Sequence, residues 1–219
     1  MRATSLTLAM VATAALLVHQ SARSDSPSNL APIPAALGAE ASPVPLDPNV
    51  HIILSPEQQR QASATGGFRQ VPKSLLRIDR RMQYGDFEWN DQGVPPGRVT
   101  VRMDLRTQIL SVFRAGHEIG TAVALYGADS KKTPLGTFPI LWKGKNHRSS
   151  LYDAPMPFTL RLTGDGVAIH GSNVRWGAAT HGCVGVPTEF ARHLFAQARV
   201  GDVVTIVRTA PFVRIAPAA

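Results

Sequence analysis

One stretch, residues 168–187, constrains the fold of this chain more than any other. It begins with a strand-like apolar run that ends at His170, continues through a glycine-containing loop, and closes with Thr-His-Gly-Cys at residues 180–183. Cys183 is the only cysteine among 219 residues. A thiol, an imidazole and glycines that let a substrate approach the backbone are groups that nucleophilic catalysis needs. The stretch therefore predicts a folded domain with a cysteine-dependent site.

The segment that precedes and surrounds this stretch has the pattern of a β domain. Apolar and polar residues alternate over 99–106, which is the period of a strand with one buried face. Shorter apolar runs follow, each bounded by turn residues, over 110–113, 119–125, 136–142 and 203–207. Residues 143–152 are polar and basic and predict a loop. Short strands between turns favour a sandwich or barrel over alternating strands and helices.

Two short helices are predicted. Residues 188–198 carry apolar side chains at helical spacing and end before Gly201, which predicts a helix directly after the cysteine block. A shorter helix over 58–62 has Ser55 as its N-cap and Pro56 in the first helical position.

The beginning of the chain predicts export. Arg2 precedes an apolar, alanine-rich run over 6–18, and small residues at 22–24 fit the site that a signal peptidase cleaves. The run is shorter than the about 20 residues that cross a bilayer. We therefore expect a cleaved signal peptide over 1–24, no membrane span afterwards, and a location in the periplasm or cell envelope.

The other boundaries follow from proline content and pattern. We expect a proline-rich disordered spacer over 25–54, a partly ordered extension over 55–95, a catalytic domain over 96–208 and a tail over 209–219. An unpaired cysteine in an exported chain cannot form an internal disulfide, and this favours a reactive thiol.

The charge balance favours an anionic partner. The chain has 23 Lys and Arg against 15 Asp and Glu, a net charge of +8. Because the basic residues are scattered and form no nucleic-acid-binding motif, we expect no nucleic-acid partner. An acidic cell wall is the more natural partner for an exported protein.

The residues alone leave the site chemistry open. His170 lies across the loop from Cys183, whereas His181 is two residues away, and the spacing does not choose between them as the base. A zinc site with these three side chains as ligands is a competing interpretation. No acidic ligand or paired-cysteine spacing accompanies them, so we expect no metal and no other cofactor. The remaining histidines of this part of the chain are expected in ordinary surface or packing positions, namely His51, His117, His147 and His193.

The His170-Gly171 pair and the Thr-His-Gly-Cys block resemble the signature of the L,D-transpeptidase catalytic domain, the YkuD-like family. Blocks at 133–138 and 154–158 resemble the same family. The resemblance implies a mostly β fold, a sandwich of packed mixed sheets with one short helix after the cysteine. Two features depart from it: the loop over 171–179 is shorter than in many members, and Gly185 stands where the family usually has Arg or Asn.

The resemblance also assigns roles at the site. Cys183 is implied as the nucleophile and His170 as its base, with the Gly171 carbonyl orienting the imidazole. His181 and Gly182 are expected to shape the turn, and backbone amides there to face an oxyanion. Thr180 is either a hydrogen-bonding brace for an imidazole or an ordinary loop residue, and Arg175 and Trp176 either grip substrate or are simply solvated. The implied catalytic set is Cys183, His170, His181, Gly171, Gly182 and Thr180.

The implied activity is that of an exported L,D-transpeptidase, expected as a monomer, with peptidoglycan stem peptides as donor and acceptor. Cys183 forms an acyl-enzyme, and an amine takes the acyl group, which gives 3→3 cross-links or attaches a lipoprotein lysine or a D-amino acid. A cysteine hydrolase that uses water at the same site and a non-catalytic wall-binding module are the alternatives. The resemblance further implies that a carbapenem acylates the same sulfur.

Overall fold

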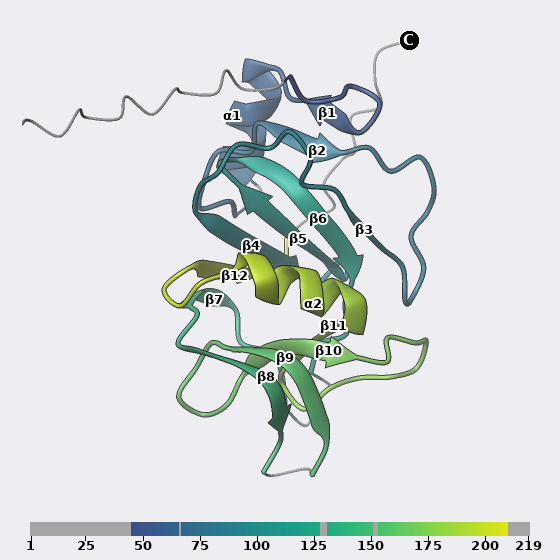
Figure 1. The fold of residues 1–219 in the computed structure, drawn as a ribbon, viewed down its shortest axis with the longest axis vertical. Helices are drawn as coiled ribbons and strands as arrows, with labels where there is room; N and C mark the ends of the chain where they lie inside the picture. The colour runs from purple at the N-terminus through teal and green to yellow at the C-terminus, as the bar shows by residue number, and fades with distance from the viewer. Residues whose placement is uncertain (1–44, 66, 128–130, 151–152, 210–219) are drawn as a thin grey trace, which may run out of the picture. The chain divides into compact units, whose positions relative to one another are not determined.

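The computed structural model describes residues 45–65, 67–127, 131–150 and 153–209. The expected signal peptide, most of the expected spacer and nearly all of the expected tail lie outside the described residues. The described residues form mostly strands in two mixed sheets, with two helices (Figure 1). This confirms the predicted fold class. Among these residues, no helix is long and apolar enough to cross a membrane.

The larger sheet combines strands from both halves of the described chain. Its strands follow the order β1 (His51–Ile53), β2 (Ser74–Leu76), β6 (His117–Val123), β5 (Ile109–Arg114), β4 (Val99–Asp104), β12 (Val203–Val207) and β7 (Gly136–Pro139). An eighth strand, β3 (Phe87–Trp89), pairs antiparallel with β6. The C-terminal strand β12 pairs parallel with β4 in the middle of the sheet. The apolar runs at 99–106, 110–113, 119–125 and 203–207 thus form β4, β5, β6 and β12, as predicted.

The smaller sheet carries the cysteine block. Its order is β11 (Val184–Pro187), β10 (Ala168–Ser172), β9 (Pro155–Arg161) and β8 (Trp142–Arg148). Strands β10 and β11 are parallel, whereas β8, β9 and β10 are antiparallel neighbours. Two isolated bridges, Leu125 to Gly185 and Gly127 to Thr180, link the segment after β6 to the cysteine block.

Helix α2 (Thr188–Gln197) contacts both sheets (Figure 1). Its buried Phe190 ring lies edge-on to Phe87 and Trp89 of β3, with centroids 5.9 and 5.4 Å apart. Further along the helix, Phe195 lies 5.8 Å from Phe158 of β9. The predicted apolar stripe is therefore core packing, and the prediction of a helix directly after the cysteine block is confirmed.

The prediction of a loop over 143–152 is wrong, because most of this segment forms β8. Residues 142–148 pair with β9 but with no other strand. An edge strand with both faces largely exposed needs no apolar alternation, so its sequence lacks the usual signal. Lys143 also ties this strand to α2, since its ammonium donates to the carbonyl oxygens of Phe195, at 2.6 Å, and Ala198.

Strand β4 is buried on both faces, which the alternating pattern did not predict. Arg102 and Asp104, expected to face solvent, are buried and form an ion pair at 3.1 Å. Phe68 lies against this pair, with the Arg102 guanidinium 4.9 Å from its ring centroid. The outer face of the sheet is covered by a segment with no periodic signal of its own.

The N-terminal extension is more ordered than expected. Helix α1 (Pro56–Thr65) begins with a reciprocal cap, in which the Gln58 amide donates to the Ser55 hydroxyl at 3.2 Å and the Ser55 amide donates to the Gln58 side chain at 2.8 Å. The helix is predicted correctly but extends beyond residue 62. Before it, β1 occupies residues assigned to the spacer, and buried His51 contacts the Glu118 carbonyl at 3.1 Å. The spacer must therefore end before β1.

Candidate active site

The parallel pairing of β10 and β11 places the two reactive side chains on one face of the smaller sheet. The register pairs Ile169 with Val184 and His170 with Gly185. Cys183 directly precedes β11, and the same register continued by one residue places it level with Ala168. Side chains alternate along a strand, so His170 and Cys183 project to the same side. They are offset by one strand spacing and by two residues along the strand, which together separate their Cα atoms by roughly 8 Å. Neighbouring strands thus present an imidazole and a thiol to a common space.

A backbone contact fixes the ring of His170. Its Nδ1 lies 2.9 Å from the carbonyl oxygen of Gly171, which assigns the proton to Nδ1 and leaves Nε2 with a free lone pair. Burial lowers the pKa of His170; the Gly171 carbonyl opposes this shift and His147 adds to it. The imidazole is therefore neutral at neutral pH and able to accept a proton.

Gly171 is tightly packed, with little room for a side chain. A Cβ at this position would lie 3.1 Å from the Pro157 side chain and 3.2 Å from the Cα of Thr188. The position is enclosed by β9 and by the first residue of α2. Its carbonyl, the partner of His170, is therefore held by the core of the smaller sheet.

The thiol of Cys183 is half-buried and lies 3.6 Å from the carbonyl oxygen of Gly166. Burial raises the pKa of Cys183, and the charge of Asp165 raises it further. The Ala168 amide and the charge of Lys131 lower it. The sulfur is thus a protonated thiol in the resting site, and attack on a carbonyl requires a base to take its proton.

Two threonine hydroxyls hold the turn before the cysteine. Thr133 donates to the Gly182 carbonyl at 3.0 Å and accepts the Gly127 amide at 2.8 Å. Thr180 donates to the Cys183 carbonyl at 2.6 Å. The Gly182 carbonyl and the Cys183 N–H belong to one trans peptide group, in which they point in opposite directions. By holding this carbonyl, Thr133 also orients the Cys183 N–H, which points away from the Thr133 hydroxyl. These contacts show Thr180 bracing the cysteine turn.

Glycine is favoured at 182 by a positive φ and at 127, which faces the turn, by close backbone packing. Gly182 has φ +100°, and a Cβ there would touch the Lys131 side chain at 3.4 Å. A Cβ on Gly127 would lie 2.1 Å from the Lys131 carbonyl and 2.7 Å from the Gly182 Cα. The aliphatic part of Lys131 therefore lies over Gly182, and this brings an ammonium group to the neighbourhood of the thiol.

The structure brings most of the predicted site residues together. His170 and Gly171 lie on β10, and Thr180, Gly182 and Cys183 lie on the turn that precedes β11. The His181 side chain is exposed on the same turn. Sequence reasoning missed Thr133, Lys131 and the electrostatic effect of His147. Thr133 opens the block at 133–138, which offered a signal, but the two basic residues have no local pattern.

The other histidines take structural positions. His117 contacts the Ser74 hydroxyl at 3.0 Å, and His193 stacks on Trp89 with a centroid distance of 5.2 Å. His147 lies edge-on to Trp142. Within the described ranges, no three His, Cys, Asp or Glu side chains are grouped as metal ligands.

Gly185 is closely packed on the face that it shares with His170. A Cβ there would lie 3.0 Å from the Ser172 Cβ and 3.5 Å from a methyl group of Thr180. Ser172 and Thr180 therefore fill the space that a side chain at position 185 would occupy, so glycine leaves no opening beside the backbone there.

Comparison with known proteins gives one family and several related folds. The family model described as the L,D-transpeptidase catalytic domain matches residues 98–206. Similar solved structures include an L,D-transpeptidase from Stackebrandtia nassauensis, with 25% identity over 52% of this chain and 57% of that chain and a TM-score of 0.47. L,D-transpeptidase 1 from Mycobacterium tuberculosis has 24% identity over 50% of this chain and 62% of that chain, with a TM-score of 0.45. The chain thus covers under two thirds of these proteins. A search of curated proteins gives no match.

Proposed function

Residues 98–206 belong to the L,D-transpeptidase catalytic domain family, and from this premise we propose that the chain is a cysteine acyltransferase that acts on peptidoglycan stem peptides. The observation that supports the proposal is the parallel register of β10 and β11, which pairs His170 with Gly185, two residues after Cys183. The contact of His170 with the Gly171 carbonyl supports the assignment of His170 as the base.

In the first half of the proposed reaction, the Cys183 sulfur attacks the carbonyl at the L-centre of the diamino acid residue of a donor tetrapeptide. The thiol proton passes to Nε2 of His170, which the Gly171 contact leaves unprotonated. The negative charge moves to the former carbonyl oxygen, where the Cys183 amide, and that of Gly182, supply hydrogen bonds. One such donor is typically worth roughly 3 kcal/mol to the transition state.

The intermediate then collapses to a thioester. The C–N bond to the terminal D-residue breaks, and His170 gives its proton to the departing amine. In the second half an acceptor amine attacks the thioester, loses a proton to His170, and Cys183 leaves as the thiol. A diamino acid side chain as the acceptor gives a 3→3 cross-link. We further propose that the protein is exported and works in the cell envelope, where this substrate lies.

Mass analysis of reactions with soluble muropeptides tests the proposal. With an amine acceptor, we expect a product whose mass is that of donor plus acceptor minus the released free D-amino acid. Without the amine, the tripeptide should accumulate slowly, because Ser172 and Thr180 fill the space at Gly185. If the tripeptide forms rapidly and its yield does not fall when an amine is added, a hydrolase would be favoured. No change of the muropeptide under either condition would contradict both enzymatic readings.

A further inference from the structure

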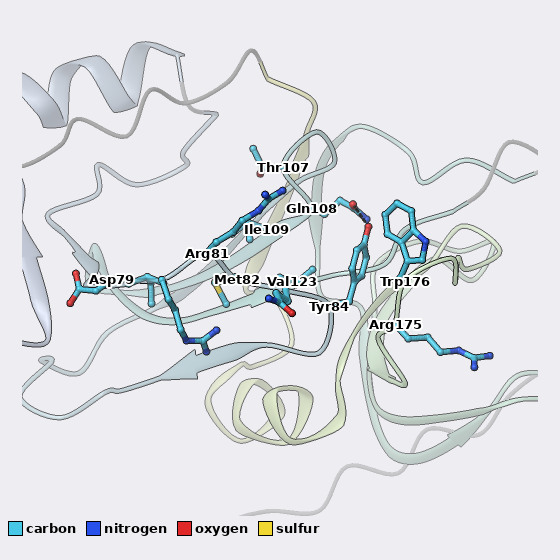
Figure 2. Close-up of a pocket in the computed structure, with 13 residues that line it drawn as sticks. Asp79, Arg81, Met82, Tyr84, Thr107, Gln108, Ile109, Val123, Arg175 and Trp176 are labelled. Carbon is cyan, nitrogen blue, oxygen red and sulfur yellow. Dashed lines mark hydrogen bonds between the residues drawn. The ribbon is translucent and has the colours of Figure 1, made fainter.

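A groove of about 1190 Å³ lies between residues 78–84 and the loop that follows β10 (Figure 2). Its other walls are residues 107–109 and Val123, and the loop contributes Arg175 and Trp176. Neither His170 nor Cys183 lines it. Because residues 78–84 precede the family-matched segment, the groove is not built by the catalytic domain alone.

An exposed aromatic pair forms one end of the groove. The rings of Tyr84 and Trp176 meet edge-on, with centroids 5.6 Å apart, and the Tyr84 hydroxyl donates to the Gln108 side chain at 2.7 Å (Figure 2). Tyr84 is therefore fixed, whereas the Trp176 side chain is 82% exposed. A large indole left in water beside a groove is typical of a recognition site. Its flat apolar face suits the CH face of a sugar ring.

The groove also carries positive charge that the described residues do not neutralise. Arg80 pairs with Asp86 and Glu88. Arg81 and Arg175 have no hydrogen-bond or ion-pair partner within the described part of the chain, and Asp79 is the one acid among the lining residues. Guanidinium groups bind carboxylates in two-point contacts. In Figure 2, Arg81 is drawn apart from the aromatic pair, and Arg175 points away from that pair.

We propose that this groove is a second binding site, which takes the disaccharide–peptide unit of peptidoglycan. The sugar rings lie against Trp176, and a stem-peptide carboxylate pairs with Arg81. This inference rests on the proposed function, because that function supplies the substrate class. A ligand that has both sugar faces and carboxylates matches both ends of the groove. Trp176 belongs to the loop between His170 and Thr180, so the groove and the Cys183 site share this loop.

Calorimetric binding to the full chain carrying Cys183→Ala tests the groove without turnover. The probes are a disaccharide-tetrapeptide and the same tetrapeptide without sugars. We expect Trp176→Ala to weaken binding of the disaccharide-tetrapeptide roughly tenfold and that of the free tetrapeptide much less. Arg81→Gln should weaken binding of both probes by roughly threefold to tenfold, and this loss should shrink at high salt.

Matched variants control for charge and for the shape of the loop. Arg60→Gln removes the same charge from exposed helix α1 and should leave both dissociation constants unchanged. Trp176→Phe, which keeps an aromatic face, should restore most of the affinity for the disaccharide. The proposal would be overturned by equal dissociation constants in all variants. It would also be overturned if Trp176→Ala lost affinity for the two probes by the same factor. Acylation of wild-type Cys183 is measured separately. A result against the binding site in the groove can therefore be distinguished from a result against the proposed acyltransferase activity.

Discussion

At the scale of single residues, the charge of Lys131 opposes the effect of burial on the Cys183 thiol. Its side chain lies over Gly182, and its charge lowers the pKa of Cys183. Replacing it with Lys131→Met should therefore raise the thiol pKa and shift the pH dependence of alkylation by iodoacetamide to higher pH. Lys132→Met, which removes an exposed neighbouring charge, should have a smaller effect. An unchanged alkylation midpoint in Lys131→Met would show that the ammonium does not act on the sulfur.

The pH dependence of acylation should report His170. Because its folded pKa is lowered, the imidazole stays neutral, and able to accept a proton, down to a pH below the usual value of 6.5. The acylation rate should therefore fall on the acidic side with a midpoint below 6.5. His170→Ala should nearly abolish acylation, whereas His181→Ala should retain the same acid limb at a reduced rate. The assignment is reversed if the limb disappears in His181→Ala and survives in His170→Ala.

At the scale of elements, Lys143 joins the edge strand β8 to the end of α2. Its ammonium donates to two carbonyls at the end of the helix, those of Phe195 and Ala198, and it lies 4.4 Å from the Phe195 ring centroid. A cation at a helix C-terminus stabilises it by about 0.3–2 kcal/mol. We expect Lys143→Met to lower the free energy of unfolding by about 1 kcal/mol in urea titrations. Lys145→Met, exposed on the same strand, should leave the midpoint unchanged, and equal midpoints in both variants would contradict this role.

At the scale of the whole molecule, the extension and the catalytic domain share one sheet. Strands β2 and β3 pair with β6, and Trp89 of β3 packs on Phe190 of α2. A protein trimmed to residues 98–206 would expose this edge and this face, so we expect it to be insoluble or to melt at a much lower temperature. A protein that starts at residue 45 should melt like the full chain, as followed by circular dichroism. Equal melting of both trimmed proteins would show that the extension does not stabilise the domain.

The sequence predicts the parts of this architecture whose residues repeat with a period. Helix α2 and strands β4 and β6 are identified by such repeats, β5 and β12 by short apolar runs between turn residues, and the cysteine turn by one contiguous motif. Exposed β8 carries no alternation because neither face enters the core. The extension strands are three residues long, too short for a period to appear. Lys131 and Thr133 reach the cysteine turn from some 50 positions earlier in the chain, and only the tertiary structure reveals that contact.

The measurement that tests the central claim most directly is intact-protein mass spectrometry after treatment with meropenem. This strained cyclic amide offers a carbonyl to the same sulfur as the stem peptide does. We predict one added drug mass, mapped by digestion to the peptide that contains Cys183 and missing in Cys183→Ala. No adduct at any concentration or time, in protein whose thiol still titrates as reduced, would contradict the account of Cys183 as an acyl-accepting nucleophile.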